Sequence, residues 1–130
     1  MMIKVKKAYI CSPLSAPTQE EIRCNMHQAR QHMKAVADKY GCRTFAPHAY
    51  LPELLDDHCP EERALGLSFG NELLKICQIL IICGNRISVG MYGEIKAALA
   101  LGLRIYSCVP EKGYQLTLLT DGRRTDEMQI

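Results

Sequence analysis

Apolar residues follow one another along this chain in two alternating patterns, one typical of buried strands and one typical of amphipathic helices. Short apolar runs predict strands at residues 4–10, 43–46, 78–83 and 103–108. The run at 78–83 is continuously apolar after its first residue. This pattern is typical of a central parallel strand that is covered on both faces.

Helices are expected in the longer segments between these strands. Thr18 and Glu21 have the spacing of a capping box, and Gly41 has the usual position of a glycine that ends a helix. Pro60 suits the first turn of a second helix, where Glu61 and Glu62 complement the positive end of the helix dipole. The three helices are predicted at about residues 18–40, 60–76 and 91–101.

Strands that alternate with helices predict an α/β fold. We expect a three-layer, doubly wound parallel sheet of four or five strands, of the flavodoxin or Rossmann-like kind. Residues 114–119 form either a fifth, edge strand or a docking segment. The chain has 130 residues, so we expect a single domain over 1–130 with a flexible tail at 120–130.

Composition narrows the class of protein. The net charge of +2 comes without a concentrated basic face, so no nucleic-acid partner is expected. No apolar stretch reaches the ~20 residues of a membrane span, and no signal peptide is visible, which predicts no membrane association and a cytoplasmic location. Most of the seven cysteines lie in apolar stretches, and these are interpreted as reduced core residues. Since they form no C-x-x-C pair, we expect no metal and no other cofactor.

Ligands of such sheets bind beyond the carboxyl ends of the strands, where we expect the loops at 11–18, 47–57 and 84–91 to meet. The last loop is rich in glycine and leads to Glu94, which is predicted in the first helical turn. There the helix dipole favours an ionised carboxylate, which can attack the anomeric carbon of a sugar. Alternatively, Glu94 only complements the dipole, since the loop lacks the standard dinucleotide and P-loop motifs.

Two separated segments, residues 8–14 and 88–94, resemble the nucleoside 2-deoxyribosyltransferase superfamily, which includes 2′-deoxynucleoside 5′-monophosphate N-glycosidases. Glu94 is followed, as in that group, by an alanine-rich helix, a glycine and another strand. The resemblance spans roughly residues 4–106. It is closest to a bacterial and phage branch with Ala46-Pro47-His48 and with Ser88-Val89-Gly90-Met91 before the glutamate.

The resemblance implies a role for each matching residue. Glu94 is the expected nucleophile, and Tyr9 is expected to orient its carboxylate through the phenol. Ser12 and Ser88, with the N–H groups of Gly90, are expected to hold sugar or phosphate oxygens. The other expected substrate-binding residues are Pro13, His48, Arg86 and Met91, with Arg86 preferred to Arg63.

Each of these residues also has a simpler interpretation. Tyr9 is equally consistent with a buried ring, Ser12 with a turn, Ser88 with a helix cap and His48 with a solvated loop. Asn71 stands near the place where the family carries an aspartate. Either its amide replaces that group as a hydrogen-bond donor, or the acid is absent.

The sequence thus predicts an N-glycosidase or deoxyribosyltransferase that acts on nucleosides or nucleotides through a covalent glycosyl-Glu94 intermediate. The alternative is a non-catalytic nucleotide-binding protein, a sensor or a sequestering protein, on the same fold. A purely structural protein would leave the glycine-rich loop and Glu94 unexplained. The resemblance also implies a homo-oligomer, formed through residues 114–119 or through the helix at 18–40.

Overall fold

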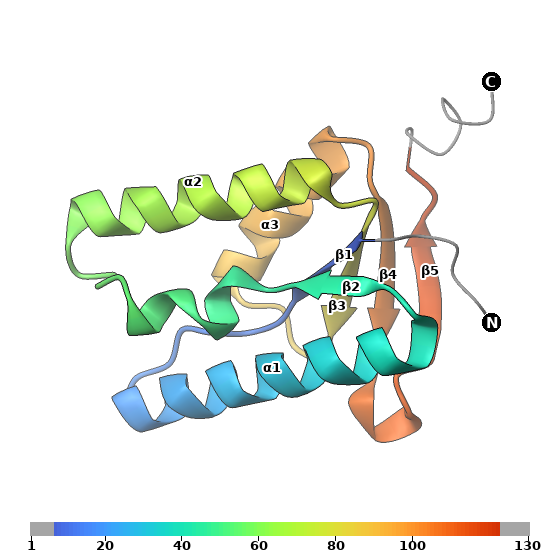
Figure 1. The fold of residues 1–130 in the computed structure, drawn as a ribbon, viewed down its shortest axis with the longest axis horizontal. Coiled ribbons are helices and arrows are strands. Elements are labelled where there is room, and N and C mark those ends of the chain that lie inside the picture. The colour runs from blue at the N-terminus through green and yellow to red at the C-terminus, as the bar shows by residue number, and fades with distance from the viewer. Residues whose placement is uncertain (1–6, 123–130) are drawn as a thin grey trace.

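The computed structural model describes residues 7–122 and confirms the three-layer α/β fold (Figure 1). The last eight residues of the predicted tail, 123–130, lie outside the described residues. The sheet has the strand order β2-β1-β3-β4-β5. Its strands are β1 (Lys7–Cys11), β2 (Arg43–Phe45), β3 (Ile79–Cys83), β4 (Arg104–Cys108) and β5 (Leu116–Thr120). The α-helices are α1 (Gln19–Tyr40), α2 (Pro60–Ile76) and α3 (Val89–Ala100).

Helices cover both faces of the sheet, with α1 on one side and α2 and α3 on the other (Figure 1). Successive residues of a strand point to opposite faces. Ala8 and Ile10 therefore pack with Val36 of α1, whereas Tyr9 packs with Leu74 of α2. The central strand β3 is buried along its whole length, as its apolar run predicts. None of the helices within residues 7–122 is long and apolar enough to cross a membrane.

The strand β5 pairs antiparallel with β4, so the sheet is mixed rather than wholly parallel. Only a short connection, which includes the 3₁₀ turn Pro110–Lys112, separates the two strands. A parallel crossover needs a dozen or more residues, so the chain returns in the opposite direction. Of the two interpretations of residues 114–119, the structure therefore has the edge strand.

The first helix has the predicted ends. The hydroxyl of Thr18 accepts a hydrogen bond from the N–H of Glu21 at 3.1 Å and donates one to the Glu21 carboxylate at 2.9 Å. Gly41 follows the helix with φ of 70°, a left-handed conformation that glycine adopts without steric penalty. These local signals fix the two ends of the helix.

The third helix starts two residues earlier than its sequence pattern predicts, at Val89. Ser88 is its N-cap, and the side-chain oxygen of Ser88 accepts from the N–H of Met91 at 3.3 Å. The prediction that Glu94 lies in the first turn is therefore wrong, since the first turn carries no acidic residue. Glu94 lies in the second turn, where the helix dipole has a weaker effect.

Candidate functional site

A cavity of about 390 Å³ opens beyond the carboxyl ends of β1 and β3. The strand order reverses between these two strands, which is the expected ligand position in such a sheet. Pockets of about 300–1,000 Å³ are typical for small molecules. Of the residues chosen from the sequence, Tyr9, Ser12, His48, Asn71, Ser88, Gly90, Met91 and Glu94 line the cavity, whereas Pro13 and Arg86 do not.

The carboxylate of Glu94 is held between two hydrogen-bond donors from β1. The phenol of Tyr9 donates to Oε2, and the thiol of Cys11 lies 3.5 Å from Oε1. The same thiol lies 3.8 Å from the carbonyl oxygen of Met91. Burial, and then the nearby carboxylate, raise the pKa of both Tyr9 and Cys11 above the usual ranges. Both groups therefore remain protonated donors.

Burial also acts on Glu94 itself. The loss of solvent raises the pKa of Glu94 from 4.5 to about 7, although the hydrogen bonds from Tyr9 and Cys11 act in the opposite direction. Desolvation disfavours the charged form, and donors to the carboxylate favour it. The burial effect is the larger one. A carboxyl group with a pKa near neutrality can be present as a reactive anion at physiological pH and can also hold a proton.

Gly70 on α2 lies against the phenol of Tyr9. A Cβ atom at Gly70 would lie 3.4 Å from the Tyr9 hydroxyl, at the short end of ordinary van der Waals contact. Tyr9 is only 1% exposed, so its ring has little freedom to move away. A glycine in the middle of a helix usually reduces stability, and here a larger side chain would extend toward the group that contacts Glu94.

The loops around the cavity are fixed to α1. Asn25 donates from its side-chain amide to the carbonyl oxygen of Leu14 at 2.9 Å, which holds the loop after β1. Arg30 donates to the carbonyl oxygen of Ala49 at 2.9 Å and stacks over the Tyr50 ring at 4.4 Å. The segment that carries His48 is thereby anchored beside the cavity.

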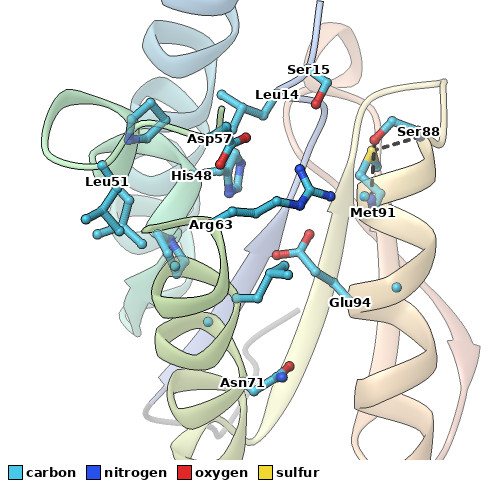
Figure 2. Close-up of a pocket in the computed structure, with 18 of the residues that line it drawn as sticks. Leu14, Ser15, His48, Leu51, Asp57, Arg63, Asn71, Ser88, Met91 and Glu94 are labelled. Carbon is cyan, nitrogen blue, oxygen red and sulfur yellow. Dashed lines mark hydrogen bonds between the residues drawn. The ribbon is translucent and has the colours of Figure 1, made fainter. Parts of the chain in front are cut away.

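The opposite wall of the cavity is formed by α2 and the turn before it. The sequence pattern did not indicate that Arg63 and Asp57 of this segment line the cavity. Figure 2 shows Arg63 extending from α2 toward the carboxylate of Glu94. Within residues 7–122, no hydrogen bond or ion pair engages this guanidinium. Asp57 also lines the cavity, although its sequence context is typical of a solvated turn. Arg86 is exposed and does not line the cavity. Of these two arginines, Arg63 is therefore the one at the cavity wall.

Asn71 lies on the same helix, roughly two turns beyond Arg63. It is an exposed residue at the cavity wall and can offer an amide donor, but it cannot supply a proton as a carboxylic acid does. In the part of the chain that the structure describes, no group of three or more His, Cys, Asp or Glu residues is placed to hold a metal ion.

Replacing Tyr9 with phenylalanine is expected to raise the pKa of Glu94 further. A hydrogen bond to a charged group contributes about 1.5–3 kcal/mol, which corresponds to an increase of about 1–2 pKa units. Carbon-13 NMR of the glutamate carboxyl groups measures this titration directly. Cys11→Ala should give a smaller increase because a thiol is a weaker donor. The matched control Tyr92→Phe, at an exposed position on α3, should leave the titration unchanged. An unaltered Glu94 titration in Tyr9→Phe would refute the assigned contact.

Comparison with solved structures identifies the fold. A 2-deoxyribosyltransferase from the psychrotolerant bacterium Bacillus psychrosaccharolyticus superposes with a TM-score of 0.59 at 22% identity, over 80% of this chain and 72% of that chain. This likeness shows a shared fold. The CMP N-glycosidase BcmB of Clostridium botulinum gives a TM-score of 0.47 at 16% identity, over 80% and 68% of the two chains.

The chain belongs to the family described as "Domain of unknown function (DUF7768)", whose model matches residues 6–108. The matched region contains all four parallel strands and the three α-helices between them. It therefore includes every residue discussed above at the cavity. No curated protein matches the sequence.

Proposed function

We propose that this protein cleaves the N-glycosidic bond of a nucleoside or nucleotide, with Glu94 as the nucleophile. The observation that carries the proposal is the carboxyl group of Glu94, held by Tyr9 and Cys11 at the wall of a cavity of small-molecule size. The same fold in a 2-deoxyribosyltransferase supports it, as does the resemblance of residues 8–14 and 88–94 to that superfamily.

The reaction has two steps with one covalent intermediate. The Glu94 carboxylate attacks the anomeric carbon of the pentose, and the bond to the base nitrogen breaks with its electron pair going to the base. The base takes up a proton from solvent water, and the sugar is left as an ester on Glu94. Water then attacks the same carbon in a hydrolase, or the nitrogen of a second base attacks it in a transferase. Either attack breaks the ester bond, releases the Glu94 carboxylate and returns a proton from the attacking group to the solvent.

Tyr9 and Cys11 assist by orientation. They are donors on both oxygens of Glu94, which fixes the plane of the carboxylate before attack. When the ester hydrolyses, the same donors stabilise the carboxylate that leaves the sugar.

A second candidate function is nucleotide binding without catalysis. Asn71 favours it, because an amide at this position cannot protonate the departing base. The loss of a positioned acid lowers rates by about 10²–10⁴-fold, while binding is retained. Asp57 also supplies a carboxyl group at the cavity, which favours the enzyme.

The two functions are distinguished by incubating the protein with deoxynucleosides, ribonucleosides and their 5′-monophosphates. Free base is followed by chromatography, and binding by calorimetry. An enzyme releases base, and Glu94→Ala abolishes this release. The matched control is Glu72→Ala, which removes a carboxylate of α2 that pairs with Lys75 at 2.6 Å and does not line this cavity. Tight binding without base release in the wild type would support the sensor, and neither binding nor release would refute both.

Arg63 should decide whether a phosphate is preferred. If the ligand is a 5′-monophosphate, Arg63→Ala should raise its KM by about 10-fold or more, because an arginine–phosphate hydrogen bond is charge-assisted. The KM for the corresponding nucleoside should change little. Arg86→Ala is the matched control, since this exposed arginine lies outside the cavity. An equal effect of Arg63→Ala on nucleotide and nucleoside would contradict this role.

A further inference from the structure

Ser12 and His48 form a hydrogen-bonded pair at the cavity wall that the reaction at Glu94 does not use. Oγ of Ser12, immediately after β1, lies 2.7 Å from Nε2 of His48, in the turn after β2. Ser12 is only 4% exposed, and both residues line the cavity. At this distance one group donates and the other accepts, so the position of one proton decides what the pair offers to a ligand.

The imidazole of His48 is neutral at physiological pH. Burial, and then the neighbouring His32 on α1, lower the pKa of His48 from 6.5 to about 4. A neutral imidazole carries one N–H and one acceptor nitrogen, and the surroundings select which is which.

The surroundings of Nδ1 select the tautomer. Nδ1 is buried and has no hydrogen-bond partner among residues 7–122. A buried N–H without a partner costs about 1–3 kcal/mol, whereas an unused acceptor lone pair is tolerated more often. The proton therefore lies on Nε2, which donates to Oγ of Ser12. The hydroxyl proton of Ser12 is then left for another acceptor, and Ser12 faces the cavity.

We propose that Ser12 and His48 form a subsite in which the Ser12 hydroxyl donates a hydrogen bond to a hydroxyl oxygen of the ligand's pentose. A neutral donor suits a neutral oxygen, since neither residue supplies the positive charge that phosphate recognition uses. The identity of the ligand rests on the proposed function, whereas the direction of the Ser12 hydrogen bond does not. His48 is a positioning residue because it acts through Ser12.

The first test is nitrogen-15 NMR of the histidine side chains in the intact protein. At pH 7, His48 should show a protonated Nε2 and an unprotonated Nδ1. A proton on Nδ1, or on both nitrogens, would overturn the proposed direction of the hydrogen bond. This measurement requires no ligand and no activity.

The second test compares a nucleoside with its 3′-deoxy and 5′-deoxy analogues by calorimetry. In the wild type, one analogue should bind about 3- to 10-fold more weakly, as expected for one neutral hydrogen bond. This difference should vanish in Ser12→Ala and persist in Ser12→Thr, which retains a hydroxyl. Ser15→Ala, at another serine of the cavity wall, is the matched control and should keep the difference.

The outcomes separate the two proposals. If nucleosides bind and the analogues show the same difference in the wild type and in Ser12→Ala, the subsite is refuted while the proposed function stands. If no nucleoside or nucleotide binds the wild type, the proposed function fails together with the pentose assigned here. The NMR result still decides whether Ser12 presents its proton to the cavity.

Discussion

Replacing Glu94 with glutamine is expected to slow base release by on the order of 10⁴-fold or more, because an amide oxygen cannot form the glycosyl ester. Glutamine keeps the size of the side chain and an oxygen that accepts from Tyr9, so the cavity should be preserved. The kcat for the preferred substrate measures the effect. Glu72→Gln, outside this cavity, should leave kcat unchanged. A Glu94→Gln protein within about 10-fold of the wild type would exclude Glu94 as the nucleophile.

The role of Glu94 as the nucleophile can also be tested by detecting the covalent intermediate. Wild-type protein that is quenched in acid during turnover should yield a peptide containing residue 94 that is heavier by one pentosyl group. The peptide from Glu94→Gln should carry no such group. An adduct on a different residue would show that this residue, and not Glu94, is the nucleophile.

The second large effect concerns stability. The pKa of Glu94 is 4.5 when unperturbed and about 7 in the folded protein. Between these values the folded state holds a proton that the unfolded state has lost, so this group makes the protein less stable as the pH rises from 4.5 to 7. The shift corresponds to about 3–4 kcal/mol. Glu94→Gln should therefore exceed the wild type in stability by about this amount above pH 7 and by little near pH 4.5.

The lowered pKa of His48 has the opposite effect on how stability depends on pH. The stability of Glu94→Gln must therefore be compared with that of the wild type at each pH. The pKa of His48 falls from 6.5 to about 4 on folding, so the unfolded state holds more protons in this range. Its contribution to stability is complete above pH 6.5 and is lost as the pH falls toward 4. In the wild type the two effects offset each other over much of this interval.

Urea unfolding of the wild type and of Glu94→Gln at pH 5 and pH 8 tests this prediction. Because the His48 contribution is present in both proteins, it cancels in their difference. The difference should grow with pH, and a constant difference would contradict the raised pKa of Glu94. A gain in stability with a loss of activity is typical of a buried catalytic charge.

The sequence determines those parts of the protein that local chemistry fixes. Thr18 and Gly41 set the ends of α1, Pro60 starts α2, and the apolar run of β3 requires a central strand. The glycine-rich loop and Glu94 are recognisable because the strand before them and the helix after them are contiguous in sequence. The class of fold and the end of the sheet that carries the site follow from these local signals.

Tertiary structure decides which distant side chains meet Glu94 and how acidic it is. Cys11 has the sequence context of a core cysteine, yet it contacts a carboxylate 83 positions away. Arg63 and Arg86 are indistinguishable as charges, and only the placement of α2 brings Arg63 to the cavity. The pKa of Glu94 likewise depends on burial rather than on its position in a helix. Local propensity acts over a few residues, whereas desolvation and long-range contacts arise only when separated segments pack together.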